Sequence, residues 1–372
     1  MSNPQQPNIR VIISGGGTGG HIFPALAIAN ALKAINPANE ILFVGAKGRM
    51  EMEKIPAAGY KIEGLWISGF QRKLTLDNLS FPFKVVSSLL KAGSIIKKFK
   101  PDVAVGVGGY ASGPLLQQAA RKGIPCLIQE QNSYPGVTNK ILARQVEKIC
   151  VAYDGMEKYF PTEKLMKLGN PVREDILKIE GKRNEAAKYF ELNAQKKTVL
   201  VVGGSLGART INQSIRAALL AFAKQDVQLI WQTGKAFYKE AMESSKPFID
   251  VKVYDFISKM DYAYAMADVV ISRAGASTIS ELCIVSKPCV LVPSPNVAED
   301  HQTKNAMALV NNHAAIIVSD ADAQNKLVDE ALQLINNTNK LLSLTSNIRK
   351  LALPNSALKI AEEVIRLAVG KK

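Results

Sequence analysis

Cysteine and histidine are scarce in this chain of 372 residues, which has four of the first and three of the second. No two cysteines form a CxxC pair, and most of them lie in short, apolar, strand-like runs. We therefore expect buried, reduced thiols of the kind found in cytoplasmic proteins at Cys126, Cys150, Cys283 and Cys289. The three histidines lie in unrelated segments, so no metal site is expected.

Long apolar runs are missing as well. No stretch approaches the ~18 apolar residues that a spanning helix needs, and the polar N-terminus lacks the apolar region of a secretion signal. Yet 47% of the residues are hydrophobic, which is enough for sizeable cores. The chain is too long for one ordinary domain of roughly 100–200 residues, so we expect two.

Acidic residues are few: 32 Asp and Glu stand against 47 Lys and Arg, for a net charge of +15. The excess is concentrated in residues 1–150, where 18 basic and 8 acidic residues leave a net charge of +10. Such asymmetry indicates an anionic partner, either nucleic acid, an acidic lipid or a phosphorylated substrate.

What the sequence does contain is a repeated pattern: a short apolar run, a Gly-rich turn, then a helical pattern. VIISGGGTGG at 11–20 and VLVVGGSLGA at 199–208 show it most clearly. Strands that alternate with helices predict parallel sheets and two α/β domains. The strands are expected near 9–14, 40–45, 103–108, 125–129 and 148–152, and again near 198–202, 228–232, 251–254, 268–272, 288–292 and 314–319.

The charged, Pro-containing stretch 159–197 separates the two series of strands. We place an N-terminal domain at 1–165 and a C-terminal domain at 166–372. The last segment, 356–372, has apolar residues at helical spacing over 356–369. It predicts an amphipathic helix that could pack back on the N-terminal domain.

Gly-rich turns follow four of the predicted strands, two in each half. The first, Gly15 to Gly20, fits GxGxxG, whose glycines let the backbone approach a phosphate at a helix N-terminus. The second predicted strand ends without the acidic residue that NAD-binding proteins use for ribose. Neither repeated loop continues into the Gly-Lys-Ser/Thr of a Walker NTPase. Four such loops indicate a ligand-binding edge in each domain.

The segment 268–281 is the most specific of these. A strand leads through small residues into a helix with Ser277, Thr278 and, about one turn in, Glu281. Helix-terminal N–H groups and hydroxyls suit a diphosphate, and a carboxylate beyond them suits the hydroxyls of a ribose. A simpler interpretation of Glu281 is an acid that complements the helix dipole.

Seven ordered blocks of this sequence resemble the MurG family. That family transfers N-acetylglucosamine from a UDP donor to a lipid-linked muramoyl-pentapeptide in peptidoglycan synthesis. The blocks are GGGTGGHIFPALAIA (15–29), GVGGYASGP (106–114), QEQN (129–132), LGNPVR (168–173), VVGGSLGARTIN (201–212), SRAGASTISE (272–281) and EDHQTKNA (299–306).

The resemblance, which spans nearly the whole chain, implies the GT-B fold: two Rossmann-like parallel-sheet domains with an interdomain cleft. It places the donor in the C-terminal domain and the lipid-linked acceptor in the N-terminal one. One departure is Gln129, where the family often has His, and the role of that position is left open.

The resemblance also implies roles for individual residues. The expected UDP ligands are Ser205, Arg173, Ala276, Ser277, Thr278, Ile279, Ser280 and Glu281. Glu281 is expected at the ribose, the Ile257 backbone at the uracil and Gln302 at the sugar. The residues expected to face the diphosphate or sugar from the other domain are Thr18, Gly19, Gly20 and Asn132.

Inverting sugar transfer requires a base for the acceptor hydroxyl and stabilisation of the departing UDP. His21 follows the first Gly-rich loop at a helix start, and an imidazole, with a pKa of about 6.5, suits a base at neutral pH. It could instead cap the helix or pack locally. Glu130 is a second candidate base, or a residue that positions His21 or the acceptor. Helix N-termini and Arg173 are expected to stabilise UDP with no metal or other cofactor.

Residues 70–100 hold seven Lys and Arg against one acid, Asp77, interleaved with Leu, Val and Phe. Part of this pattern is helix core, and the rest predicts a peripheral patch on anionic lipids. The expected partners are therefore UDP-N-acetylglucosamine, undecaprenyl-linked muramoyl-pentapeptide and anionic inner-membrane lipids at the cytoplasmic face, with no nucleic acid.

Three alternatives stay open. One is another UDP-sugar enzyme of the same fold, such as a glycolipid synthase or a UDP-N-acetylglucosamine epimerase. The second is an NAD-dependent oxidoreductase. The third, suggested by the positive charge, is a non-enzymatic nucleic-acid-binding module. That class usually shows aromatic-studded basic surfaces or a known motif, and the sequence has neither.

Overall fold

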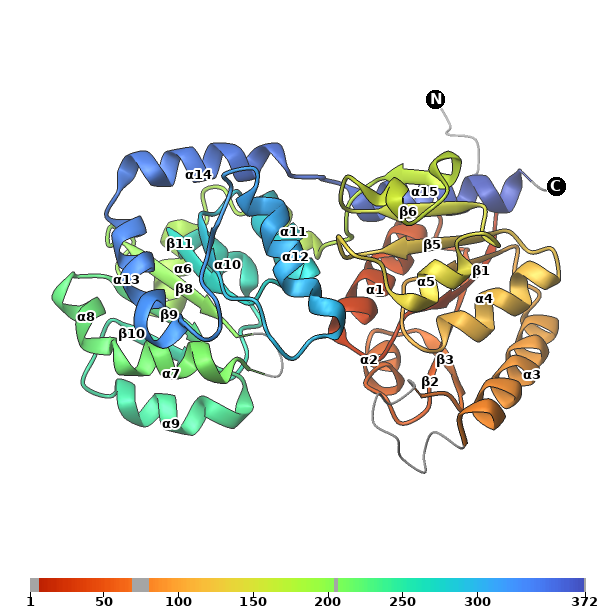
Figure 1. The fold of residues 1–372 in the computed structure, drawn as a ribbon, viewed down its shortest axis with the longest axis horizontal. Helices are drawn as coiled ribbons and strands as arrows, with labels where there is room; N and C mark the ends of the chain where they lie inside the picture. Colours follow the sequence, from red (N-terminus) through yellow and green to blue (C-terminus); the bar gives the residue numbers. More distant parts are fainter. Residues whose placement is uncertain (1–6, 69–79, 204–206, 371–372) are drawn as a thin grey trace. The chain divides into compact units, whose positions relative to one another are not determined.

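A computed structural model describes residues 7–68, 80–203 and 207–370 of the chain. They form two compact units, each built on a parallel sheet (Figure 1). Unit 1 comprises Met1–Val172 and Pro354–Lys372, and unit 2 comprises Arg173–Leu353.

The sheet of unit 1 has the strand order β3-β2-β1-β4-β5-β6-β7, with every neighbouring pair parallel. Its strands are β1 (Arg10–Ser14), β2 (Glu40–Ala46), β3 (Lys61–Leu65), β4 (Val103–Gly106), β5 (Cys126–Glu130), β6 (Lys148–Val151) and β7 (Leu165–Lys167). The helices are α1 (Gly19–Ile35), α2 (Glu51–Ala57), α3 (Phe81–Phe99), α4 (Ser112–Arg121), α5 (Val137–Leu142) and α15 (Ser356–Val369), with short 3₁₀ turns η2 (Met156–Lys158) and η3 (Thr162–Lys164).

The sheet of unit 2 has the order β10-β9-β8-β11-β12-β13 and is also parallel. Its strands are β8 (Thr198–Val202), β9 (Gln228–Gln232), β10 (Val251–Tyr254), β11 (Val269–Ser272), β12 (Cys289–Leu291) and β13 (Ile316–Ile317). The helices are α6 (Arg183–Phe190), α7 (Arg209–Ala217), α8 (Leu219–Lys224), α9 (Lys235–Ser245), α10 (Met260–Met266), α11 (Ala276–Val285), α12 (His301–Val310), α13 (Ala323–Ile335) and α14 (Thr338–Lys350), with 3₁₀ turns η4 (Glu174–Leu177) and η5 (Ala298–Asp300).

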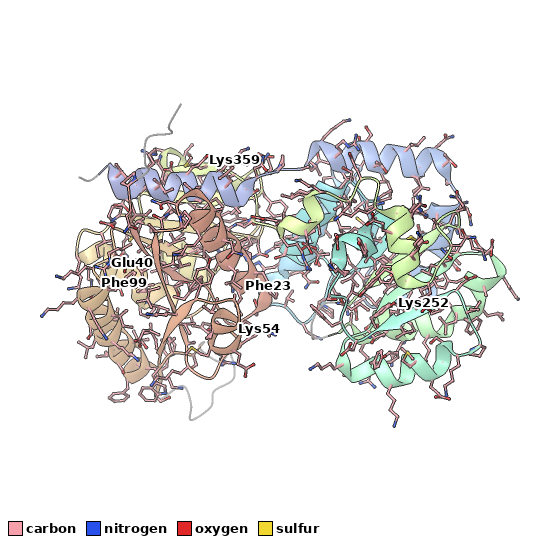
Figure 2. All side chains as sticks on the ribbon, turned by 180° about the vertical axis from the view of Figure 1, so that it is seen from behind. Phe23, Glu40, Lys54, Phe99, Lys252 and Lys359 are labelled. Atoms are coloured by element: carbon pink, nitrogen blue, oxygen red, sulfur yellow. The ribbon has the colours of Figure 1, made fainter. Side chains whose placement is uncertain are left out.

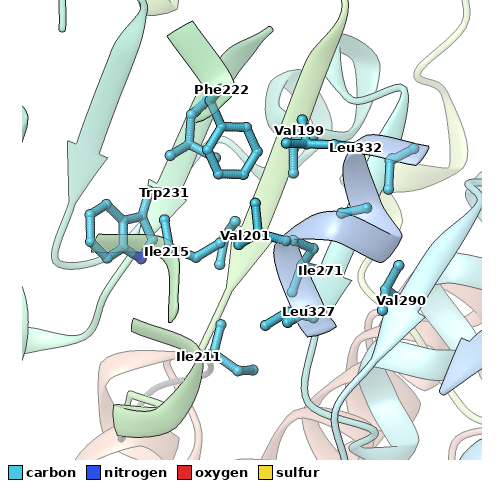
Figure 3. Packing of buried hydrophobic residues seen from close by; sticks show 14 of the residues in the cluster. Val199, Val201, Ile211, Ile215, Phe222, Trp231, Ile271, Val290, Leu327 and Leu332 are labelled. Carbon is cyan, nitrogen blue, oxygen red and sulfur yellow. The ribbon is translucent and has the colours of Figure 1, made fainter. Parts of the chain in front are cut away.

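The central strands are apolar on both faces because helices cover both sides of each sheet. All five residues of β8 are buried, and so are the last four of β1. In unit 2 the largest buried side chain is Trp231, which packs among aliphatic residues of the strands and helices (Figure 3). Its indole N–H donates to Asn212 Oδ1 at 3.0 Å, so its polar atom is satisfied inside the core.

In each sheet, the Gly-rich turns follow the two strands between which the strand order reverses direction. In unit 1 the reversal lies between β1 and β4, and in unit 2 between β8 and β11. The loops that leave the carboxyl ends of two such strands diverge, and this opening is where α/β proteins bind their ligands. The two-unit α/β architecture expected from the sequence is confirmed.

The boundary between the units lies after Val172, seven residues beyond the expected end of the first domain at 165. The reason is β7, which the sequence analysis missed and which extends the first sheet by pairing with β6. The final helix, α15, belongs to unit 1, not to unit 2. Its apolar face, with Ile360 and Val364, is buried in the same cluster as Ile28 and Leu32 of α1.

Two smaller expectations concern the thiols and the membrane. The four cysteines are buried and free, as predicted, which fits small apolar side chains in the two cores. Within the described ranges, no helix combines the length and apolar character needed to cross a bilayer.

Candidate active site

His21 lies in the first turn of α1, where the loop after β1 ends. Its Nδ1 lies 2.9 Å from the carbonyl oxygen of Gly16. A carbonyl only accepts, so Nδ1 carries the hydrogen and Nε2 keeps a lone pair. The local fold therefore selects the tautomer in which Nε2 can accept a proton.

Gly108, in the loop after β4, holds the other side of this imidazole. A Cβ at Gly108 would lie 2.7 Å from His21 Cδ2 and 2.8 Å from its Nε2, and the backbone there has φ +98°. Both facts require glycine. The loops also join through the backbone, since the N–H of Val107 donates to Ser14 O at 2.7 Å. Gly108 lies in one of the four Gly-rich turns that predicted a ligand-binding edge, but its contact with His21 is visible only in the fold.

Glu51, at the start of α2, was missed by the sequence analysis. Its buried carboxylate accepts the N–H of Gly17 at 2.9 Å and the N–H of Ala46 at 3.0 Å. It fills the space that a side chain at Gly16 or Gly45 would need. The N–H of Gly17 is therefore directed inward to Glu51, and the donors of this loop for an anion are those at the start of α1. No local sequence signal identifies such a residue.

Glu130 is buried at the end of β5, and both of its oxygens are occupied. Oε1 accepts the backbone and side-chain N–H groups of Asn132 at 3.0 and 3.2 Å. Oε2 accepts the N–H of Gly136 at 3.0 Å and the side chain of Asn139 at 2.9 Å. A carboxylate with four such donors is well suited to hold a loop, and both of its oxygens are already engaged. The geometry therefore favours the positioning role for Glu130 over that of a base.

The neighbouring amides connect this loop to the β4 loop. Gln131 Nε2 donates to Val107 O at 2.8 Å, and Gln129 Nε2 donates to Asn170 Oδ1 at 2.8 Å. Gln129 is fully buried, so its side chain serves to connect parts of the fold. Thr18 and Gly20 are exposed and Gly19 is half-buried. Phe23, labelled in Figure 2, is 55% exposed one turn farther along α1.

In unit 2, α11 begins after β11 with the small residues that the sequence singled out. The first N–H groups of a helix have no partner within it, so those of Ala276, Ser277 and Thr278 are available to an anion. The hydroxyl oxygen of Ser277 is buried and has no hydrogen-bond partner among the described residues. By contrast, the N–H of Ile279 donates to Gly275 O at 3.0 Å and its side chain is buried in the core.

Within the same helix, the Ser280 hydroxyl donates back to Ala276 O at 3.0 Å. Ile279 and Ser280 thus contribute to the helix itself, and of the six expected UDP ligands in this turn they are the least suited to the role. The candidate anion site narrows to the three residues of the first turn. Ser205 lies outside the described residues.

Glu281 lies just beyond this turn, next to a buried tyrosine. The Tyr264 hydroxyl donates to Glu281 Oε2 at 2.9 Å. Burial raises the pKa of Glu281 to about 7, although this hydrogen bond and the charge of Arg173 act in the opposite direction. Glu281 therefore keeps its proton to a higher pH than an ordinary glutamate does, and Oε1 is the oxygen that can accept from a hydroxyl donor.

Arg173 approaches the same region from the start of η4. Its Nε donates to Asp175 Oδ1 at 2.7 Å and its NH2 group to Ser258 O at 3.4 Å. The side chain is partly exposed and partly neutralised by Asp175. The neighbouring Ile257 N–H donates to Gln232 Oε1 at 2.9 Å, so a base contact by this backbone falls to its carbonyl.

Two further residues organise the carboxyl edge of this sheet. Gln302 Oε1 accepts the N–H of Ser294 at 2.8 Å. This bond fixes the side-chain amide and leaves its Nε2 group to donate to another acceptor. Arg273, missed by the sequence analysis, follows β11 and donates to Asp320 Oδ1 at 2.5 Å. Asp320 and Asp322 form an Asp-x-Asp pattern of the type that can hold a divalent ion. Here Asp320 also accepts the Thr210 hydroxyl, and Asp322 accepts the Ser319 hydroxyl.

Comparison with known proteins places the two units in one family. The models of the N-terminal and C-terminal domains of glycosyltransferase family 28 match residues 11–151 and 198–363.

The chain belongs to glycosyltransferase family 28.

Its curated relatives narrow the comparison. A protein from Parabacteroides distasonis is 57% identical over 98% of this chain and 99% of its own length, and one from Bacteroides fragilis is 58% identical over 97% and 96%. Both are named UDP-N-acetylglucosamine–N-acetylmuramyl-(pentapeptide) pyrophosphoryl-undecaprenol N-acetylglucosamine transferase. The family resemblance deduced from the seven sequence blocks is confirmed.

Solved structures show the same fold. The crystal structure of MurG from Acinetobacter baumannii has a TM-score of 0.78 and 28% identity, and covers 96% of this chain and 99% of its own. The GT-B assignment of this family member is thereby confirmed. A UDP-GlcNAc 2-epimerase from Neisseria meningitidis has a TM-score of 0.67, covering 98% of this chain and all of its own. At 15% identity, it shows that the fold is shared and nothing more.

Proposed function

We propose that this chain is an inverting, UDP-N-acetylglucosamine-dependent N-acetylglucosaminyltransferase. It transfers the sugar to the muramoyl 4-hydroxyl of undecaprenyl-pyrophosphoryl-muramoyl-pentapeptide. The observation that carries the proposal is the 57–58% identity to transferases of that name over nearly the whole chain. The helix starts at the reversal points of both sheets support it, because each offers N–H donors to a phosphate.

The donor is assigned to unit 2. The first turn of α11 receives the diphosphate through the N–H groups of Ala276, Ser277 and Thr278 and through the Ser277 hydroxyl. The oxygen of that hydroxyl is buried and has no partner among the described residues. Glu281 accepts a ribose hydroxyl on Oε1. The carbonyl of Ile257 meets the uracil, and the Gln302 amide, held by Ser294, donates to the sugar.

The chemical step needs a base and a stabilised leaving group. His21 Nε2 accepts the proton of the muramoyl 4-hydroxyl, as the new bond forms from that oxygen to the anomeric carbon. The bond between the anomeric carbon and the phosphate oxygen breaks, and UDP departs with the electron pair. The first turn of α11 and the Arg173 guanidinium offset the charge on UDP. Glu130 holds Asn132 in place for the acceptor or donor.

The lipid-linked acceptor requires a membrane-facing surface, which we assign to unit 1. On α3, Phe83, Val86 and Leu90 form an exposed apolar stripe at helical spacing. Trp66 lies beside it, 50% exposed, with the Lys84 ammonium 5.9 Å from its ring. Soluble proteins rarely expose a contiguous apolar stripe to solvent. This stripe fits insertion into the interfacial region of a cytoplasmic membrane leaflet.

The basic residues of α3 divide into two groups. Lys91 bonds Gly64 O at 2.9 Å and pairs with Glu63, and Lys84 donates to the Ser68 hydroxyl at 3.3 Å. Lys97 and Lys98, near the end of the helix, are exposed. We therefore assign the contact with anionic headgroups to the latter pair. Leu74, Leu76 and Leu79, which belong to the same predicted patch, lie outside the described residues.

The deciding experiment is a transfer assay with radiolabelled UDP-N-acetylglucosamine and a lipid-linked muramoyl-pentapeptide analogue. Incorporation of label into the lipid fraction is expected, and it should persist in EDTA because no step uses a metal. Release of free UDP without labelled lipid would refute the acceptor. Conversion of the donor to an epimer would favour the epimerase alternative, and activity lost in EDTA and restored by magnesium would reveal a required ion.

A further inference from the structure

Unit 2 has a cavity of about 1090 Å³ at the amino edge of its sheet, opposite the edge that carries the donor loops. Its wall includes Ala267 and Asp268, just before β11, and Lys287 and Pro288, just before β12. The end of α11, the segment from η4 to α6 and one face of α14 complete it. The volume suits a small organic molecule, for which pockets of roughly 300–1,000 Å³ are usual.

The charged residues of the wall are mostly cationic. Arg183 is neutralised by Asp268, to which it donates two hydrogen bonds of 3.0 and 2.9 Å. Lys287 Nζ donates once, to Ala267 O at 2.6 Å, and two hydrogens of its ammonium are unused within the described part of the chain. Burial lowers the pKa of Lys287 to about 8, although Asp268 acts against this. An anion in the cavity would complete its coordination.

The charges at the mouth add to this imbalance. Lys178, just after η4, and Arg349, on α14, are exposed residues of the lining, and Glu180 is the acid nearest in sequence to Lys178. Because Arg183 and Asp268 neutralise each other, the remaining charged residues of the lining are three cations, Lys178, Lys287 and Arg349, and one anion, Glu180. A local excess of this kind attracts and holds a negative charge.

Most of the uncharged wall is aliphatic, with Ser286 and Thr345 as polar exceptions. Ile176 and Leu177 come from η4, Ile284 and Val285 from the end of α11, and Leu341 from α14. Leu177 is 39% exposed, so apolar surface is left uncovered there. Covering it with a hydrocarbon chain would gain about 25 cal/mol for each Å² removed from water.

We propose that this cavity is an effector site for an amphipathic anion, a carboxylate or phosphate carried on an aliphatic chain. The anionic group binds the Lys287 ammonium, and the chain lies along the aliphatic wall. A fatty acid and an anionic phospholipid both combine a negatively charged group with an aliphatic chain.

The site is joined to the donor region by two elements. Helix α11 carries Ser277 and Thr278 in its first turn and ends in the cavity wall with Val285, while η4 begins beside Arg173 and also enters the wall. A ligand that shifts either element alters the donor groups at its other end. This coupling rests on the proposed function, whereas binding in the cavity does not.

The binding test is calorimetric titration of the full chain with decanoate below its micellar concentration. Lys287→Met should bind decanoate about tenfold or more weakly, because it keeps the length of the side chain and removes its charge. Lys326→Met is the matched control, since Lys326 lies exposed on α13 and pairs with Asp322. Decanol and inorganic phosphate, each with half of the recognised chemistry, should both bind much more weakly than decanoate.

Equal decanoate affinity for Lys287→Met and the parent chain would refute the site, and so would decanol binding as tight as decanoate. If Lys287→Met does not fold, Arg349→Glu tests the same charge at the exposed mouth and should weaken decanoate severalfold. Fatty acid and lipid head are distinguished by repeating the titration with a short-chain phosphatidic acid. Tighter binding of the latter would identify the lipid as the source.

The coupling test titrates UDP with and without saturating decanoate, and the UDP affinity should change severalfold. Unchanged UDP affinity at a fully occupied cavity would refute the effector role. Failure of UDP to bind without decanoate would instead count against the proposed function and leave the cavity site standing.

Discussion

His21 donates its Nδ1 hydrogen to Gly16 O, and this single contact decides which nitrogen can act as a base. Replacing His21 by Ala should lower turnover by about 10²-fold or more while UDP affinity stays nearly intact. The measurement is steady-state kinetics at saturating substrates together with UDP calorimetry. His313→Asn, at an exposed position whose φ of +50° Asn tolerates, is the control. Wild-type turnover in His21→Ala would exclude it as the base.

Gly108 tests the same imidazole from its other side. In Gly108→Ala the new methyl would lie 2.7 Å from His21 Cδ2, so the ring must move and turnover should fall about tenfold or more. Gly48→Ala is a matched control, because its φ is +70° and nothing lies within 4 Å of the added Cβ. Both variants place an alanine at a positive φ, which costs about 1–2 kcal/mol of backbone strain. Only Gly108→Ala also brings the new methyl against His21. Similar turnover in the two variants would show that Gly108 serves the turn alone.

The buried carboxylate of Glu281 lowers the stability of the fold when it is ionised, and the same carboxylate is expected to bind the ribose of UDP. Its pKa is about 7 in the folded chain and 4.5 in an ordinary glutamate, so the folded state holds the proton more tightly than the unfolded chain does. Its contribution to stability is therefore fully present below pH 4.5 and is lost as pH rises through 7.

Glu281→Gln should consequently be more stable than the parent chain at pH 8, by roughly 1–3 kcal/mol, and about equally stable at pH 5. Denaturant melts at the two pH values measure this. A variant destabilised at pH 8 would show that the carboxylate, and not the neutral acid, is the form that the fold prefers.

The same substitution should weaken UDP by roughly 1–3 kcal/mol at pH 8, because a ribose hydroxyl loses a charged acceptor. In the parent chain UDP affinity should rise as pH passes upward through 7. The Gln variant, which shares the titration of UDP itself, serves as the baseline. Parallel pH profiles for the two proteins would remove Glu281 from the ribose.

Among the elements, α3 is unusual because its apolar residues face both the core and the solvent. Ala92 and Ile96 are buried, whereas Phe83 and Leu90 are 73% and 72% exposed. The double change Phe83→Ser, Leu90→Ser should reduce binding to anionic vesicles and remove the part that persists at high salt. Ile249→Ser, which changes an apolar residue that is 85% exposed in unit 2, is the control.

Vesicle co-sedimentation at low and high salt makes this measurement, and UDP affinity should be unchanged because the donor is assigned to unit 2. Replacing Lys97 and Lys98 by Glu should remove the complementary, salt-sensitive part of the binding. Co-sedimentation indifferent to both pairs of substitutions would show that α3 presents an ordinary surface, and the lipid acceptor would have to be reached by another face.

At the scale of the whole molecule, the chain enters unit 2 after Val172 and returns to unit 1 at Pro354. Removing 354–372 should uncover the cluster around Ile28 and Leu32, where Ile360 and Val364 are fully buried. Two such side chains contribute roughly 3–6 kcal/mol, a large share of the 5–15 kcal/mol that stabilises a typical domain.

The truncated chain should therefore lose transfer activity but keep UDP binding, as unit 2 is complete at Leu353. Transfer assays and UDP calorimetry on the same preparation separate the two effects. Leu358→Ala, at a position 42% exposed on the same helix, should leave both intact. A truncation that lost UDP binding as well would show that the two units do not fold independently.

The sequence by itself determined the features that depend on local pattern. Buried parallel strands read as short apolar runs, and the Gly-rich turns that follow them lie at the reversal points of the two sheets because each comes directly after a central strand. The seven motif blocks then identified the family. Even so, β3 and β7 escaped notice, since edge strands such as KIEGL are half polar and short.

The tertiary structure decided what depends on residues far apart in the chain. Glu51 reaches Gly17 across 34 positions, and Tyr264 reaches Glu281 across 17, so neither carboxylate's partners can be read from its neighbours. Burial and hydrogen-bond donors set whether a carboxyl group is charged, and both come from packing. Packing likewise engages both oxygens of Glu130, which the sequence offered as a base or as a positioning residue, and it joined α15 to the unit whose apolar face it could cover.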